Sequence, residues 1–162
     1  MKHLLLVRHA EPSLNYTNIK DFDRSLNESG IYESKLMGQE LVERKFTPDY
    51  IMSSGASRAL ETAKILSNKI NYDLNEIVIN NNIYHGSYEN VLEIIKNLSD
   101  KYEKLMIVGH NPTMHLLSQI LTGEKNEKFS TCSMCYIKFD IENWILINSG
   151  KKQFLISPKL FK

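Results

Sequence analysis

The sequence predicts an α/β fold, in which helices cover both faces of a mostly parallel central sheet in a three-layer α/β/α sandwich. Two apolar runs, Leu4 to Val7 and Lys104 to Val108, show no alternation, which is typical of strands buried on both faces of a parallel sheet. Amphipathic segments with helical spacing alternate with such runs along the chain. A length of 162 residues, with 42% hydrophobic and 24% charged residues, predicts one globular domain over residues 1–162.

The first expected elements are a strand, a long loop and a helix. The strand ends abruptly in Arg8 and His9, and a short buried helical segment is the competing interpretation of its apolar residues. Residues 11–25 are polar and aperiodic, which indicates a loop over the strand ends. A helix is expected to begin near Asn27 and to stop before Pro48. Its expected inward-facing residues are Ile31, Met37, Leu41 and Val42.

Two further units of a strand and a helix follow. Residues 49–53 form the second expected strand, and the next helix carries Arg58 in its first turn, beside free backbone N–H groups. Residues 77–79 form the third expected strand, and residues 80–82 turn the chain toward another amphipathic helix. The apolar positions that define these helices are Ala59, Ala63, Leu66 and Ile70 in the first, and Tyr88, Val91, Leu92, Ile95 and Leu98 in the second.

The last third of the chain repeats the opening pattern. The strand at residues 104–108 is followed by Gly-His-Asn-Pro and by a helix that Gly123 is expected to end. The expected inward-facing residues of this helix are Leu116, Leu117, Ile120 and Leu121. Residues 133–139 and 144–148 are expected to form a hairpin that closes one edge of the sheet.

Charge and composition exclude several classes of partner. A net charge of +1 argues against nucleic acid or an anionic membrane as an obligatory partner. No apolar run approaches the roughly 20 residues of a membrane span, and the amino terminus lacks the cleavage site of a signal peptide. We therefore expect a cytosolic monomer without a cofactor.

Neither the cysteines nor the histidines show the spacing of a metal site. Cys132 and Cys135 form a CxxC, but no second pair completes a zinc site and the motif precedes a strand, so two ordinary thiols are expected. His110 and His115 are five residues apart rather than four, and no HExxH motif occurs. The sequence therefore predicts no catalytic metal.

Two histidines occupy equivalent places, His9 after the first strand and His110 after the later one. Ligands of open α/β sheets bind at the carboxyl ends of the strands, where Arg8 and Arg58 would join them. Arginine forks and helix amino termini both suit phosphate oxygens. Any one histidine at a strand end is more often structural, so the predicted phosphate pocket depends on these four residues together.

A neutral histidine in such a pocket can act as a nucleophile. Neighbouring guanidinium charges disfavour its protonation, and a backbone carbonyl is expected to hold one ring nitrogen so that the other faces phosphorus. Arg8, Arg58 and His110 could neutralise the transferred phosphoryl group without a metal. The predicted mechanism is a phosphohistidine intermediate on His9, hydrolysed by water.

The chain resembles the histidine phosphatase superfamily, also called phosphoglycerate mutase-like, in three motifs that occur in order. These are Arg8-His9-Ala10, the segment Ser-Ser-Gly-Ala-Ser-Arg-Ala-Leu-Glu-Thr-Ala at residues 53–63, and Val-Gly-His-Asn-Pro at residues 108–112. The resemblance implies a phosphoglycerate mutase-like fold, with His9 as the phosphorylated nucleophile. It also implies that Arg8, Arg58 and His110 complete the phosphate pocket.

Within that superfamily, the chain is similar to the SixA-type phosphohistidine phosphatases. The similarity lies in the short length, in Ala10 where glycine is commoner, in Asp-Arg-Ser-Leu at residues 23–26 and in the Gly-His-Asn-Pro run. Arg24 matches an arginine that this branch contributes from its first long loop. We expect Arg24, His85 and Asn111 to contact the substrate.

Two of these assignments leave an alternative open. Arg24 could instead be a solvated loop residue paired with Asp21 or Asp23. His85 is equally consistent with an exposed loop residue.

One departure from the larger relatives bears on the substrate. Mutases and sugar-phosphate phosphatases of the superfamily carry a glutamate as general acid after the third strand, where this chain has Ile-Tyr-His-Gly-Ser at residues 83–87. A phosphoramidate has a better leaving group than an alkyl phosphate, so the missing acid favours phosphohistidine in a protein as the substrate. Glu11, His85 or Glu89 could still donate a proton. The alternatives are a small-molecule phosphatase or mutase, and a phosphoprotein-binding module without turnover.

Overall fold

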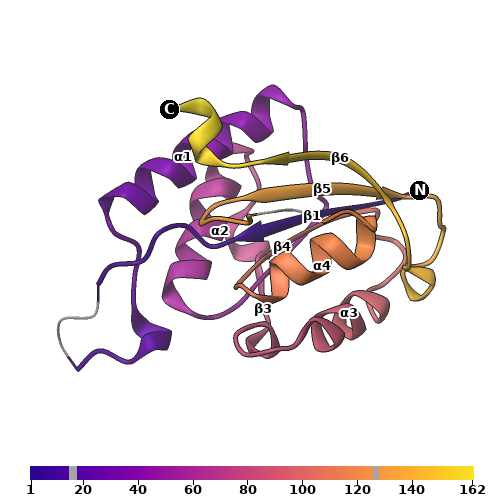
Figure 1. Cartoon of the computed structure of the whole chain (residues 1–162), viewed down its shortest axis with the longest axis horizontal. Coiled ribbons are helices and arrows are strands. Elements are labelled where there is room, and N and C mark those ends of the chain that lie inside the picture. The colour runs from indigo at the N-terminus through magenta and orange to yellow at the C-terminus, as the bar shows by residue number, and fades with distance from the viewer. Residues whose placement is uncertain (15–17, 126–127) are drawn as a thin grey trace.

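A six-stranded mixed sheet forms the centre of the molecule, and the computed structural model describes residues 1–14, 18–125 and 128–162 (Figure 1). The strand order is β3-β2-β4-β1-β5-β6, with β1 to β4 parallel and β5 and β6 antiparallel to their neighbours. The strands are β1 (Lys2–Arg8), β2 (Tyr50–Ser53), β3 (Val78–Ile79), β4 (Lys104–Gly109), β5 (Met134–Phe139) and β6 (Lys151–Ile156). The predicted α/β fold with a mostly parallel sheet is confirmed.

Helices cover both faces of this sheet. They are α1 (Glu28–Glu43), α2 (Ser57–Lys69), α3 (Tyr88–Lys96) and α4 (Thr113–Thr122). In β1, Leu4 and Leu6 belong to the core under α3 and α4, whereas Leu5 and Val7 belong to the core under α1 and α2. Because both faces are buried, the strand needs apolar residues at consecutive positions, as its sequence indicated.

Helix α1 begins where the sequence predicted, because the Asn27 side chain accepts a hydrogen bond from the Gly30 backbone N–H at 2.7 Å. Its buried side differs from the prediction: Met37 and Leu41 are buried, but Ile31 and Val42 are exposed. The other residues on the buried side are mostly small, namely Gly30, Ser34 and Gly38, with Glu33 beside them. A Cβ at Gly38 would lie 2.7 Å from Lys69 Cγ, so α2 packs too closely for larger side chains.

The predicted buried side of α4 is also partly wrong. Leu117 and Leu121 are buried as predicted, whereas Leu116 and Ile120 are exposed on the outer side one turn apart. The buried side of α4 also includes Thr113 and Ser118. The pattern of polar and apolar residues was therefore not enough to predict which side of α4 faces the sheet. Gly123 ends the helix with φ of 70°, a left-handed conformation that glycine adopts without strain.

The C-terminal prediction was right about β5 and wrong about its partner. Residues 144–148 do not pair with β5, because Trp144 begins a short 3-10 turn and is fully buried, with its indole N–H donating to the Tyr102 carbonyl at 2.8 Å. The strand that closes this edge is β6, at Lys151–Ile156. Its two lysines and a glutamine are typical of an exposed edge strand. Because these residues are polar, the segment lacks the apolar run from which the other strands were predicted.

The predicted loop at residues 11–25 joins β1 to α1. Residues 15–17 of this loop lie outside the described residues. In the remainder, Asp21–Asp23 forms a 3-10 turn, and Pro12 bridges to Leu26. Over the described ranges, no helix has both the length and the apolar character needed to cross a membrane.

Candidate active site

The two histidines at the strand ends lie side by side. Arg8 on β1 is in register with Gly109 on β4, so the residues that follow them, His9 and His110, meet at the same edge of the sheet. The His9 backbone N–H donates to the Gly109 carbonyl at 3.0 Å, and the centroids of the two imidazole rings are 5.1 Å apart. Both rings are buried, with 6% of His9 and 8% of His110 exposed.

The hydrogen bonds of His9 fix which ring nitrogen carries the proton and which carries the lone pair. Nδ1 lies 2.7 Å from the Ala10 carbonyl oxygen, which can only accept, so Nδ1 carries the proton and Nε2 keeps its lone pair. The Ala10 N–H donates in turn to Thr62 Oγ1 at 3.0 Å, which fixes the segment that holds the ring. Nε2 faces Arg58, whose Nε is 3.4 Å away. The expectation of a backbone carbonyl behind the ring therefore agrees with the geometry.

Burial and charge both keep His9 neutral. Burial lowers the pKa of His9 from 6.5 to about 4, and the positive charges of Arg58, Arg8 and Arg24 act in the same direction. The hydrogen bond to the Ala10 carbonyl opposes them. Burial is the largest cause, whereas the sequence pointed only to the guanidinium groups.

His110 is held differently. Its Nε2 lies 2.9 Å from Ser54 Oγ, at the end of β2. Burial lowers the pKa of His110 to about 3, with His9 and Arg58 adding to the effect. The ring is therefore neutral at pH 7 and can exchange a hydrogen bond with a bound group without carrying charge.

Arg58 enters the pocket from the first turn of α2, as its position in the sequence indicated. Besides facing His9, its Nη1 donates to the Asp21 carbonyl at 2.7 Å and its Nη2 donates to Asp21 Oδ2 at 2.9 Å. Arg8 donates from Nη1 to the Phe129 carbonyl at 3.2 Å, and its buried Nε has no partner within the described residues. Two guanidinium groups thus stand near His9 from different elements.

Arg24 shows the pairing with Asp21 that was one of its two interpretations, and its contact with substrate stays a prediction. It forms an ion pair with Asp21 Oδ1 at 2.8 Å and donates to the Ser13 carbonyl at 3.1 Å. Its charge nevertheless lies close enough to help lower the pKa of His9. The arginine is a paired loop residue at the margin of the pocket.

The other two predicted contact residues, His85 and Asn111, follow Tyr84 and His110 directly in the sequence. The exposed ring of His85 packs on Tyr84, with the ring centroids 3.9 Å apart. Asn111 Nδ2 donates to the Phe129 carbonyl at 2.7 Å, so Asn111 and Arg8 share one acceptor. The peptide bond between Asn111 and Pro112 is cis.

Four residues of this region were not predicted to belong to the site: Ser54, Thr62, Tyr84 and Asp21, the last of which was named only as a possible partner of Arg24. Asp21 is the most informative of them, because its carboxylate contacts Arg24, Arg58 and Tyr84. Hydrogen bonds from Tyr84 and the arginines hold the pKa of Asp21 below its usual range. Ser54 and Thr62 lie inside the quoted 53–63 motif, which was the available signal for them.

Of the three candidate proton donors, His85 is close enough to His110 for its charge to help lower the pKa of that ring. Glu11 accepts from Asn27 Nδ2 at 3.1 Å, and Glu89 lies in the first turn of α3. A search of the described residues finds no group of three or more His, Cys, Asp or Glu side chains that could hold a metal ion. Cys132 and Cys135 are buried free thiols.

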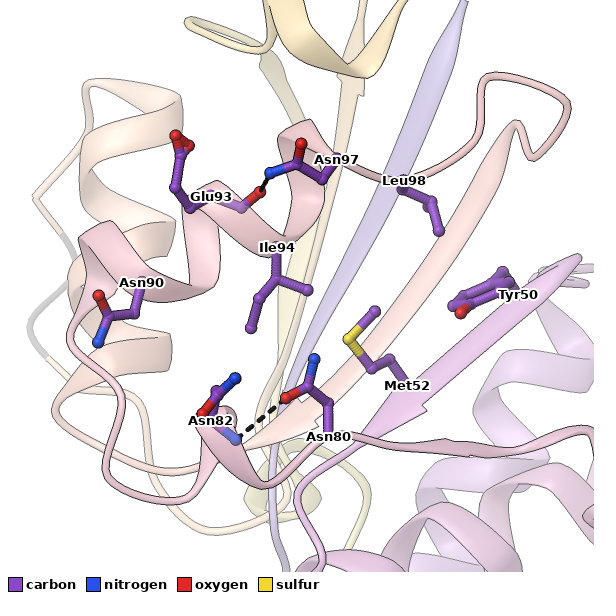
Figure 2. A pocket seen from close by; sticks show the side chains of 9 residues that line it. All are labelled: Tyr50, Met52, Asn80, Asn82, Asn90, Glu93, Ile94, Asn97 and Leu98. Atoms are coloured by element: carbon purple, nitrogen blue, oxygen red, sulfur yellow. Dashed lines mark hydrogen bonds between the residues drawn. The ribbon is translucent and has the colours of Figure 1, made fainter.

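A cavity of about 620 Å³ lies elsewhere, between α3 and β2 (Figure 2). Amides and apolar side chains line it together with one carboxylate: Tyr50, Met52, Asn80, Asn82, Asn90, Glu93, Ile94, Asn97 and Leu98. It contains no arginine or lysine, so a phosphoryl group is better accommodated by the arginines around His9.

Comparison with known proteins gives one family. The profile of the histidine phosphatase superfamily (branch 1) matches residues 4–91, which include Arg8, His9 and Arg58. The serine/threonine-protein phosphatase Pgam5 of Drosophila grimshawi, a mitochondrial protein, is 39% identical over 74 residues, which make up 44% of this chain and 24% of that protein. An uncharacterized chloroplastic protein of Arabidopsis thaliana is 25% identical over 151 residues, covering 88% of this chain and 69% of that protein. The chain thus spans about a quarter of the length of the Drosophila relative.

Solved structures resemble the chain over nearly all of its length. The candidate phosphohistidine phosphatase SixA from Agrobacterium tumefaciens has a TM-score of 0.84 and 26% identity, covering 97% of this chain and 98% of its own. The protein histidine phosphatase SixA, solved as a complex with tungstate, has a TM-score of 0.85 and 21% identity, covering 99% of both chains. At that lower identity, the likeness concerns the fold alone.

Proposed function

This chain belongs to the histidine phosphatase superfamily (branch 1), and on that premise we propose that it is a phosphatase that removes the phosphoryl group from phosphohistidine in proteins. His9 is the nucleophile and passes through a phosphohistidine intermediate. The observation that supports this role best is the orientation of the His9 ring. Nδ1 is held by the Ala10 carbonyl, while the unprotonated Nε2 faces Arg58.

The reaction follows from this orientation in two displacements. Nε2 attacks phosphorus, the bond between phosphorus and the substrate nitrogen breaks, and the new bond to Nε2 forms. The proton stays on Nδ1, where its hydrogen bond to the Ala10 carbonyl stabilises the positive charge of the phosphorylated ring. The cationic ring is a good leaving group because it departs as neutral His9. Water then attacks phosphorus, the bond to Nε2 breaks, and inorganic phosphate leaves.

The arginines supply the charge that phosphoryl transfer requires. A phosphoryl group carries negative charge on three oxygens, and the protein contributes chiefly by positioning and neutralising them. Arg58 and Arg8 are well placed for this role, because the charges of both act on His9 and lower its pKa. His110 contributes a neutral ring beside His9. No step assigned here needs any group other than these side chains and water.

The leaving group distinguishes the candidate substrates. The Asp21 carboxylate contacts Arg58 in the pocket, and its lowered pKa makes it a poor proton donor. An alkoxide leaving group needs a proton in the transition state, whereas the imidazole of phosphohistidine can leave as a neutral ring when its other nitrogen is protonated. This supports phosphohistidine over alkyl phosphates.

One finding favours a second candidate substrate, phosphoserine or phosphothreonine in a protein. The Drosophila grimshawi relative is named a serine/threonine-protein phosphatase and matches this chain at 39% identity over 74 residues. The SixA neighbour from Agrobacterium tumefaciens is named for phosphohistidine instead. The common element of the two names is a phosphorylated amino-acid side chain.

A substrate panel tests the proposal. Purified protein is given a phosphohistidine-carrying protein, a phosphoserine peptide, an aryl phosphate and a sugar phosphate at matched concentrations. We expect kcat/KM for the phosphohistidine protein to exceed that for the phosphoserine peptide by about a hundredfold or more, because only the latter needs a general acid. Turnover of the esters without turnover of phosphohistidine would overturn the substrate assignment.

The binding-only alternative has its own control. A module that only recognises phosphoprotein would bind the phosphohistidine protein without releasing phosphate. Phosphate release by the wild type, and its loss in His9→Ala, would exclude that alternative.

A further inference from the structure

A single carboxylate joins three groups at the mouth of the pocket. Asp21 Oδ2 accepts from Arg58 Nη2 at 2.9 Å and from the Tyr84 hydroxyl at 2.5 Å. Asp21 Oδ1 accepts from Arg24 Nη2 at 2.8 Å and from Arg24 Nε at 3.2 Å. The contacts come from α2, from the loop after β3 and from the first loop itself, so Asp21 connects all three.

We propose that Asp21 is a positioning residue, which orients Arg58 so that one edge of its guanidinium group faces the phosphoryl group on its way to His9 Nε2. This inference deepens the proposed function and rests on it for the identity of the bound group. It assigns a role to an acidic side chain inside a pocket that binds an anion, where a negative charge would otherwise oppose binding.

The geometry of Arg58 carries the inference. A guanidinium group has five N–H donors in one plane, and Nε–H shares an edge with one N–H of Nη2. Asp21 takes the end of the fork, through its carbonyl at Nη1 and its carboxylate at Nη2. The edge with Nε is the one that faces His9 Nε2. Asp21 therefore occupies donors that a phosphoryl group beside Nε2 does not need.

Burial gives the contact its strength. The Arg58 side chain is 8% exposed, whereas that of Asp21 is 48% exposed. A buried guanidinium group without a partner is costly, so Arg58 would turn toward other acceptors or toward solvent if Asp21 were absent. With Asp21 present, Arg58 stays in one orientation before the substrate arrives, which favours binding because less order must be created on contact.

Tyr84 fixes Asp21 through the same carboxylate oxygen that Arg58 contacts. Besides donating to Asp21, the Tyr84 ring packs edge-on against Phe22, with centroids 4.9 Å apart, and lies 5.9 Å from Arg58 Cζ. Each Asp21 carboxylate oxygen thus already accepts two hydrogen bonds. A carboxylate so fully engaged is suited to holding neighbours in place, and not to accepting a substrate proton.

Direct measurement of oxyanion binding tests the proposal independently of turnover. The probes are inorganic phosphate and tungstate, titrated calorimetrically into the wild type and into Asp21→Asn. The matched control is Asp23→Asn, which removes the same charge from the same 3-10 turn at an exposed residue. Loss of a negative charge alone should tighten anion binding in both variants. Loss of positioning should weaken it in Asp21→Asn alone.

We expect Asp21→Asn to bind both oxyanions at least about tenfold more weakly and to raise KM for an aryl phosphate by a similar factor, with Asp23→Asn within about twofold of the wild type. Tyr84→Phe, which deletes one bond to Asp21, should weaken binding in the same direction by a smaller factor. Unchanged or tighter binding in Asp21→Asn would overturn the positioning role. Weaker binding in Asp21→Asn would support it even if phosphohistidine proves not to be the substrate.

Discussion

The two histidines of the pocket have the same surroundings in the sequence and different tethers in the structure. Each follows a central parallel strand, each is buried, and burial lowers the pKa of both. Yet His9 is held through Nδ1 by a backbone carbonyl, whereas His110 is held through Nε2 by the Ser54 hydroxyl. His9 Nε2 therefore faces the pocket, where it accepts a hydrogen bond from Arg58 Nε at 3.4 Å, whereas His110 Nε2 is bonded to the Ser54 hydroxyl.

This difference shows why position at a strand end does not by itself assign a role. A carbonyl can only accept, so it fixes the tautomer of His9 and leaves a lone pair on the opposite nitrogen. A hydroxyl can donate or accept, so Ser54 lets His110 adopt whichever tautomer a bound phosphoryl group requires. The tether of His9 suits a nucleophile, and that of His110 suits a group that adjusts its hydrogen bond to bound charge.

Removing each imidazole ring in turn is the strongest test of the difference between His9 and His110. His9→Ala should lose covalent labelling by a radiolabelled phosphoryl donor and about 10⁴-fold or more in turnover, because no nucleophile remains. His110→Ala should still be labelled but turn over about 10²- to 10³-fold more slowly, because it loses only a stabilising contact. His3→Ala, which changes the opposite end of β1, is the control and should keep wild-type rates. Label retained by His9→Ala would show that the two roles are misassigned.

Titration distinguishes the two rings by their lowered pKa values. In ¹⁵N spectra of the imidazole rings, His9 should titrate near pH 4 and His110 near pH 3, below the ordinary value of 6.5. The unfolded chain binds these protons at higher pH than the folded chain, so the free energy of unfolding should fall as the pH drops from 6.5 to 4. For His9 the expected loss is about 3 kcal/mol, and His9→Ala should show a correspondingly shallower fall. A His9 midpoint near 6.5 would contradict the buried neutral ring.

The smallest change concerns the tether of His110. Ser54 Oγ meets His110 Nε2 and also accepts from the Ala56 N–H at 3.1 Å, so Ser54→Ala should cost about 1 to 3 kcal/mol in the free energy of unfolding. We expect turnover to fall about tenfold, because the ring loses its orientation. Ser67→Ala is the matched control, since Ser67 Oγ is buried with no hydrogen-bond partner among the residues that the structure describes. Equal effects of the two substitutions, by thermal melting and by rate, would remove the special role of Ser54.

The elements that the sequence predicted well are those in which burial requires apolar side chains. The strands β1 and β4, both buried in the middle of the sheet, and α2, with its alanines against the sheet, fall in this class. The predicted burial of Ile31 and Ile120 was wrong, because an apolar side chain can remain exposed at little cost. On α1, glycine and serine occupy the buried side instead. The strand β6 was missed because, as an edge strand, it is partly exposed and begins with Lys151, Lys152 and Gln153.

For the candidate site, the sequence indicated which charged residues and histidines lie at the strand ends. It did not indicate which residues they contact. His9, His110, Arg8 and Arg58 lie in motifs whose positions follow from the order of strands and helices. Asp21 lies in a polar loop with several carboxylates nearby, and only the three-dimensional contacts distinguish it from Asp23. Its sequence signal is therefore weak, although its contacts are the most numerous in the pocket.

The two sides of the pocket differ in the free energy that is needed to open them. β1 pairs with β4 on one side and β5 on the other, so the strand that carries His9 should exchange its amide hydrogens mostly through global unfolding. The Asp21–Asp23 turn is joined to the body of the protein largely through side chains, by Asp21 to Arg58 and by Phe22 to Tyr84. Such a segment can open locally at much lower free energy. The proposed nucleophile thus follows a strand that opens only with the whole sheet, whereas Asp21 lies on a turn that we expect to detach and re-form without unfolding the sheet.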